Sequence, residues 1–171
     1  MKRFELTSRR AILLGTGALA AVMAVYPAMR QVGSYPTPAQ SFAQLGPKTA
    51  AIYALLGDFL APAGGPLPGS GGDAESLARL DQLLASVPSQ TATLLMALPL
   101  AFEHATALDR YGARSLSHLP PDRQRAFLAE WADADDLVRA QLFMGLRSVI
   151  GMMYFERADV VRAMHIAPGC G

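Results

Sequence analysis

Three histidines are the side chains best suited to bind a metal or move a proton, and they are scattered along the chain. His104, His118 and His165 have no second histidine or cysteine at the spacing of a metal site. Glu103 directly precedes His104, so on a helix the two side chains point about 100° apart and do not easily ligate one ion together. A di-iron bundle needs two Glu-x-x-His pairs, and the sequence has neither. The sequence therefore predicts no metal site, with each histidine at the surface or at a helix end.

Other catalytic and binding patterns also fail to appear in the sequence. Residues 64–72 are rich in glycine, but no strand precedes them and no Lys-Ser/Thr follows, as a phosphate-binding loop requires. The acidic run 133–136 lacks the alternation, the glycine and the distal Glu of a calcium loop, and we expect it to cap a helix. No G-x-S-x-G nucleophile elbow occurs. We therefore assign no catalytic, cofactor-binding or metal-binding residue to this chain, and we expect it not to be an enzyme.

The N-terminus carries the pattern of a twin-arginine export signal. An uncharged stretch rich in Ala, Leu, Val and Gly follows the arginine pair over residues 11–26. This length suits the apolar region of a signal peptide and is short for a membrane-spanning helix of about 20 residues. No good cleavage pattern follows, so residues 1–30 are either a cleaved signal peptide or a retained anchor. We expect export by the twin-arginine translocase to the periplasmic side of the cytoplasmic membrane. The residues that carry the signal are Ser8, Arg9, Arg10 and Leu13.

Composition limits the partners of this chain. Half of the 171 residues are apolar, which is enough for one packed domain. Without residues 1–30 the chain has 10 basic and 13 acidic side chains, so the remainder is mildly acidic and we expect no nucleic-acid binding. The single cysteine, Cys170, excludes an internal disulfide and leaves either an intermolecular bridge or an unpaired terminal thiol. The stability of the domain must therefore come from packing or from docking on a partner.

Proline, glycine and hydrophobic periodicity divide the rest of the chain into helices. Three prolines predict an extended linker over residues 31–47, ahead of a helical domain over 48–171. The Gly/Pro run over 61–72 predicts a mobile surface loop, and Pro99 is expected to kink or break its helix. No strand-like alternation of any length occurs, so the predicted fold is all-α: a small irregular helical bundle of about five helices after an N-terminal signal or anchor helix. The predicted helices cover residues 48–60, 74–87, 88–111, 121–132 and 136–155, with a short helical turn over 159–164.

The last long predicted helix is apolar around nearly its whole circumference. Such a helix either lies at the centre of its own core or is covered by another chain, and the sequence leaves both interpretations open. We therefore treat its large side chains, with the tryptophan of the preceding helix, as candidates for partner contact or for packing. These candidates are Trp131, Phe143, Met152, Met153, Tyr154 and Phe155.

Three segments of the C-terminal third resemble a known family. They are residues 119–131 (LPPDRQRAFLAEW), 145–155 (GLRSVIGMMYF) and 158–169 (ADVVRAMHIAPG). Together with the twin-arginine signal, they look like the small-subunit family of gluconate 2-dehydrogenase and related membrane-bound dehydrogenases. Chains of that family have a helix ending in Trp, a helix ending in paired aromatics, a short valine-containing helix and a Pro-Gly end. Residues 164–166 (MHI) depart from the Leu-Gly-aromatic pattern of the family, which leaves the subfamily open.

The resemblance implies a non-catalytic role in a complex. In that family the large subunit is of the glucose-methanol-choline type, binds FAD and oxidises an alcohol or sugar, and a c-type cytochrome carrying haem often takes the electrons. The small subunit supports folding and export of the large one. The resemblance thus predicts a small (gamma, or subunit 3) subunit with no cofactor of its own, FAD in its partner and haem c in a third subunit. The alternative is a self-standing, membrane-tethered helical binding or structural protein on the periplasmic side.

Overall fold

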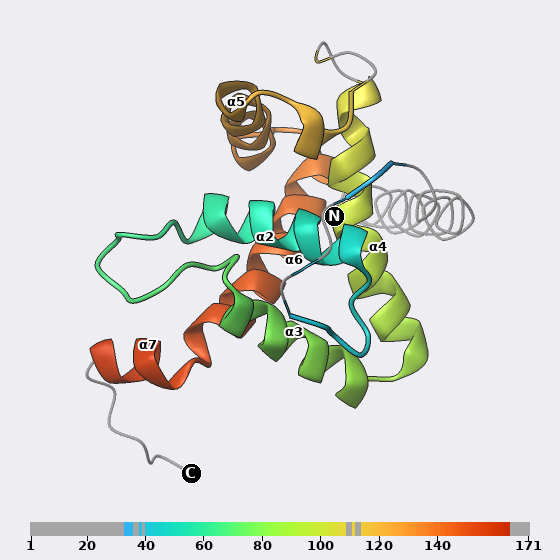
Figure 1. Ribbon diagram of the computed structural model, residues 1–171. Helices are drawn as coiled ribbons and strands as arrows, with labels where there is room; N and C mark the ends of the chain where they lie inside the picture. Colours follow the sequence, from blue (N-terminus) through green and yellow to red (C-terminus); the bar gives the residue numbers. More distant parts are fainter. Residues whose placement is uncertain (1–32, 36–37, 39, 109–110, 112–113, 165–171) are drawn as a thin grey trace, which may run out of the picture. The chain divides into compact units, whose positions relative to one another are not determined.

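The computed structural model describes residues 33–35, 38, 40–108, 111 and 114–164. Within these residues the chain forms six α-helices and two 3-10 turns and no strand, so the all-α prediction is confirmed for this part (Figure 1). The export-signal residues Ser8, Arg9, Arg10 and Leu13 lie outside the described residues. The elements are α2 (Pro47–Leu60), α3 (Ala74–Ser86), α4 (Ser89–Ala105), η1 (Thr106–Leu108), η2 (Leu116–His118), α5 (Pro121–Ala132), α6 (Leu137–Phe155) and α7 (Ala158–Ala163).

Local capping chemistry sets several helix boundaries. Asp73 accepts a hydrogen bond from the Ser76 amide at the start of α3, and Asp136 accepts one from the Val138 amide at the start of α6. α2 and α5 each begin with a proline, whose fixed φ and missing N–H suit the first helical position. These signals are local in sequence, and the predicted starts of the helices agree with the observed ones to within a residue or two.

A kink or a break was expected at Pro99; α4 is continuous through this residue, so the break does not occur. A proline in a helix leaves the carbonyl four residues earlier without its usual amide donor. Here that carbonyl belongs to Leu95, and it accepts a 2.6 Å hydrogen bond from the Tyr53 hydroxyl of α2. A donor from another helix thus replaces the missing amide. α4 ends at Ala105, earlier than the predicted Tyr111, because the backbone turns into η1 and the Thr106 hydroxyl donates to Arg114 O.

The Gly/Pro loop between α2 and α3 is packed against the body at its C-terminal end. Its residues 62–66 are exposed, whereas residues 70–72 are buried, which corrects the expectation of a surface loop throughout. A Cβ at Gly57 would lie 2.2 Å from Gly71 O, and one at Gly72 would lie 2.0 Å from Ala54 O. Only glycine permits this approach of the loop backbone to the α2 backbone.

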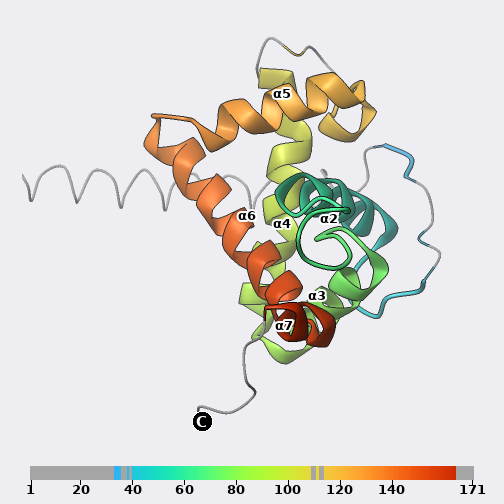
Figure 2. The same ribbon diagram turned by 90° about the vertical axis from the view of Figure 1, so that its left-hand side faces the viewer.

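α6 is the helix around which the others are arranged. It contacts α2, α3, α4, α5 and α7, and Figure 2 shows α2, α3 and α4 on one side of it, with α5 and α7 near its two ends. One side of α6 therefore lies in the core of the described domain, which is one of the two interpretations that the sequence left open. No helix within the described residues is long and apolar enough to cross a membrane. Fully buried core side chains include Ile52, Tyr53, Leu56, Leu80, Leu100, Phe102, Phe127, Leu128, Leu146, Ile150 and Met153.

Candidate functional site

The outer side of α6 carries an apolar stripe. Leu137, Met144, Met152 and Phe155 are separated by seven, eight and three residues, a spacing that places them on one face of a helix. Their exposed fractions lie between 48 and 63%. Every large apolar side chain that is exposed in the described part of the chain belongs to α6, with Val138 as the remaining one. We call these four residues the α6 stripe, and a concentration of this kind is typical of a contact surface.

The six residues predicted as partner contacts divide into two groups. Trp131, Phe143, Met153 and Tyr154 are buried within this chain, so their surfaces are already covered by its own core. Met152 and Phe155 are exposed and belong to the α6 stripe. The predicted list lacked Leu137 and Met144, although both could be found by asking which apolar positions of the helix lie opposite its core-facing residues.

An aromatic cluster explains the burial of Trp131. Its ring centroid lies 4.7 Å from that of Phe102 and 5.7 Å from that of Phe127, and the Arg139 guanidinium lies 5.4 Å from its centroid. Phe143 joins the cluster through Phe102 at 6.3 Å. The indole Nε1 of Trp131 is buried and has no hydrogen-bond partner among the described residues. Packing of rings, rather than polar recognition, is therefore the role of these residues in the folded chain.

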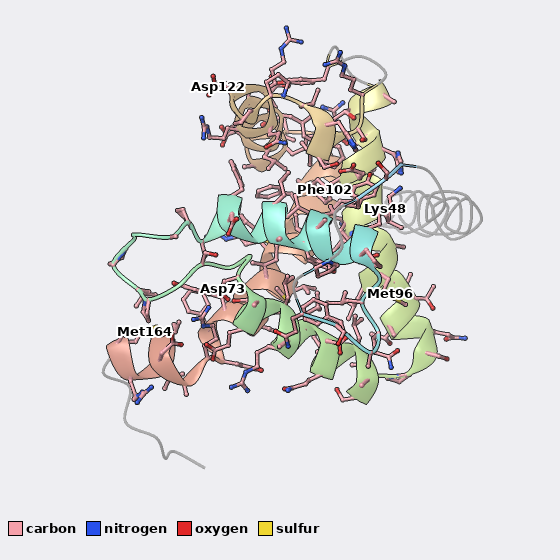
Figure 3. The ribbon with its side chains drawn as sticks, viewed as in Figure 1. Lys48, Asp73, Met96, Phe102, Asp122 and Met164 are labelled. Atoms are coloured by element: carbon pink, nitrogen blue, oxygen red, sulfur yellow. The ribbon has the colours of Figure 1, made fainter. Side chains whose placement is uncertain are left out.

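A second feature, a buried polar cluster, was not predicted from the sequence. Glu103 of α4 is fully buried, and it accepts hydrogen bonds from the Tyr35 hydroxyl (2.5 Å) and from the Ser117 amide (3.1 Å) and hydroxyl (2.5 Å). Lys48, labelled at the start of α2 in Figure 3, is buried and its Nζ lies 3.1 Å from His104 Nε2. A charged group buried in this way costs much less when it is hydrogen-bonded.

The environment of this cluster changes the acidity of two of its members. Burial, together with the hydrogen bond to Glu103 and the negative charge of that carboxylate, raises the pKa of Tyr35 to about 12. Burial lowers the pKa of Lys48, although the nearby Glu103 carboxylate acts in the opposite direction. These polar groups bond to one another, so the cluster holds together α2, α4, η2 and the segment around Tyr35.

A third feature is a buried arginine between the loop, α3 and α7. Arg157 forms ion pairs with Asp73, with Glu75 at 3.3 Å and with Asp159 at 2.8 Å. It also donates to Ser70 O and to the Ser76 hydroxyl. Burial alone would raise the pKa of the Asp73 carboxyl, but hydrogen bonds from Arg157 and from the Ser76 and Ser70 amides outweigh it and hold that pKa below its usual range. Asp73 is labelled just before α3 in Figure 3.

A groove of about 610 Å³ lies between α2 and α5. Its polar side chains already have partners: Asp58 accepts from the Ser70 hydroxyl at 2.6 Å, and Arg125 pairs with Asp122 at 2.5 Å. Within the described residues, no group of three or more His, Cys, Asp or Glu side chains is placed to hold a metal ion. The lining residues are Leu55, Asp58, Phe59, Pro62, Pro121, Gln124, Arg125 and Leu128.

Comparison with known proteins gives no relative from which a role could be transferred. No family model, no curated protein and no solved structure matches the chain. The resemblance to the small subunits of gluconate 2-dehydrogenase therefore stays a prediction that rests on residues 119–131, 145–155 and 158–169.

Proposed function

We propose that this chain is the non-catalytic small subunit of an exported, membrane-associated flavin-dependent alcohol or sugar dehydrogenase. The observation that carries the proposal is the α6 stripe, because it concentrates the exposed large apolar side chains of the described residues on the helix that also organises the core. Residues 1–30 serve as the twin-arginine signal or anchor, 31–47 as the linker and 48–171 as the accessory domain, an irregular helical bundle. The partner large subunit carries FAD, and a c-type cytochrome is the further electron carrier.

The free energy available from burying the α6 stripe indicates how large the contact with a partner must be. Full burial of a Leu, Met or Phe side chain contributes about 1.5–3 kcal/mol, so four half-exposed side chains contribute roughly 3–6 kcal/mol before any cost. Association itself costs at least about 4 kcal/mol in lost translational and rotational freedom. The stripe alone is therefore too small to hold a stable complex. The partner must also cover neighbouring surface, with the stripe as the centre of the interface.

The proposal is tested by purifying the C-terminally tagged chain from a mildly solubilised membrane and periplasmic fraction. We expect a larger polypeptide with flavin absorbance to co-purify, with haem bands where a cytochrome is present. The double substitution Met144→Glu and Phe155→Glu should abolish this, because it places two charges at the centre of an apolar contact. Ala126→Glu with Ala129→Glu is the matched control, since it adds the same two charges at exposed positions of α5.

The outcomes separate the two candidate functions. A yellow partner that is lost in the stripe variant and retained in the control supports the accessory subunit. A chain that purifies alone and colourless contradicts it and favours the self-standing, membrane-tethered protein. A flavoprotein that remains bound to the stripe variant would show that the contact lies elsewhere on the chain.

A further inference from the structure

The side chain of Tyr35 occupies a slot built by three separate elements. Its hydroxyl donates to Glu103 of α4, the Lys48 ammonium of α2 lies 5.1 Å from its ring centroid, and the His118 ring of η2 packs edge-on at 5.6 Å. The contacting residues are 13, 68 and 83 positions away in the sequence. The slot therefore exists only after α2, α4 and η2 have packed together.

A second carboxylate holds the chain shortly before α2 begins. Asp81 of α3 accepts hydrogen bonds from three consecutive amides, those of Ala43 (2.9 Å), Gln44 (2.7 Å) and Leu45 (2.9 Å). These amides lie within the segment that was predicted to be a linker. Two carboxylates on two different helices thus attach this segment at two points, and the more N-terminal point is Tyr35.

We propose that the contact between Tyr35 and Glu103 is a latch that attaches the N-terminal part of the chain to the helical body once the body has folded. With the latch closed, residues 27–34 separate the apolar stretch of the export signal from its first attachment point. With the latch open and the Asp81 contacts kept, residues 27–42 would separate it from Ala43. At 3.3–3.6 Å per residue these lengths correspond to about 28 Å and about 55 Å of fully extended chain. The latch would therefore set how far the folded domain can lie from its own export signal or anchor.

The latch itself depends only on the described contacts, whereas its consequence for export rests on the proposed function. The test is limited proteolysis of the isolated full-length chain with subtilisin, a protease of broad specificity, and the cut sites are located by mass spectrometry. Tyr35→Phe removes the hydroxyl and leaves the peptide bonds between residues 36 and 43 unchanged. We expect cleavage between residues 36 and 43 to become at least about tenfold faster, because the lost hydrogen bond is to a buried carboxylate.

Ser117→Ala is the matched control, because it removes a different hydroxyl from the same carboxylate. Its cleavage rate between residues 36 and 43 should stay within about twofold of the wild-type rate. Both variants are compared at a temperature where circular dichroism shows them to be folded. Equal cleavage rates for wild type and Tyr35→Phe would overturn the proposal, and so would an equal acceleration in both variants or global unfolding of Tyr35→Phe. The assay contains no flavoprotein, so its result is independent of the accessory-subunit proposal.

Discussion

The hydrogen bond from Tyr53 to Leu95 O should be coupled energetically to Pro99. Because residue 99 has no amide N–H, the Tyr53 hydroxyl is the donor that replaces it at 2.6 Å. Tyr53→Phe leaves this carbonyl unpaired in a part of the protein where the Tyr53 side chain is fully buried. Such a loss lowers the free energy of unfolding by about 1–3 kcal/mol. At about 2–4 °C per kcal/mol for a chain of this length, the expected fall in Tm is several degrees.

The energetic coupling between Tyr53 and Pro99 is measured by making Tyr53→Phe in a chain that has alanine at position 99. Pro99→Ala restores an amide N–H that can bond to Leu95 O within α4, so the hydroxyl of Tyr53 is no longer needed there. We expect Tyr53→Phe to cost at least about 1 kcal/mol less in the Pro99→Ala background than in the wild type. Urea unfolding of the four proteins, followed by circular dichroism, measures this difference.

The control for this cycle is Tyr154→Phe. The Tyr154 hydroxyl also donates to a backbone carbonyl, that of Pro68 at 3.1 Å, in a different part of the fold. Its removal should cost the same with proline or alanine at position 99. If Tyr53→Phe also costs the same in both backgrounds, the argument that Tyr53 substitutes for the missing amide is refuted.

Three further predictions follow from the loop, the ion pairs and the signal. Gly57→Ala should destabilise the chain by more than about 1 kcal/mol, because the Cβ overlaps the Gly71 backbone, whereas Gly145→Ala, whose Cβ would meet Leu98 Cδ2 at an ordinary contact distance of 4.0 Å, should stabilise it by up to about 1 kcal/mol; equal effects on Tm would contradict this. The lowered pKa of Asp73 means that its stabilising contribution is present above the unfolded pKa of about 3.9 and is lost as the pH falls below it. Unfolding free energies measured from pH 6 to 3 should thus fall less steeply for Asp73→Asn, and an unchanged slope would count against the ion pair. Finally, Arg9→Lys with Arg10→Lys should leave both this chain and the proposed flavoprotein partner in the cytoplasm on cell fractionation, and a partner exported normally would argue against joint export.

The helices could be predicted from the sequence because their signals are local. Asp73, Asp136 and the prolines that open α2 and α5 act within one turn of the chain, and the predicted boundaries there agree with the observed ones. The continuity of α4 could not be predicted, because the donor that replaces the Pro99 amide comes from α2. Burial of the loop also depended on a contact between distant segments, since a glycine run indicates turns but not what packs against them.

The candidate site could be predicted only in part, again because local patterns do not show which distant segments pack together. Periodicity identified α6 as apolar on all sides, but it could not say which side faces the core, so Met153 and Met152 were treated alike although one is buried and the other exposed. The Glu103 cluster draws on residues up to 68 positions away from the carboxylate, and no spacing rule connects them. The N-terminal signal was assigned from its residues alone and lies outside the described part of the chain.

Because α6 both packs in the core and carries the exposed stripe, binding of a partner would affect how much of this protein a cell contains. One side of α6 packs against α2, α3, α4, α5 and α7, and the other carries the α6 stripe. A partner bound at the stripe therefore stabilises all these helices together, and each tenfold excess of partner over its Kd adds about 1.4 kcal/mol to the free energy of unfolding. A chain without its partner has less of this protection against proteases, which act on the unfolded fraction. Under the proposed function, its abundance should therefore follow the supply of the partner, so that deleting the partner's gene would lower the level of this chain without any change in its own synthesis.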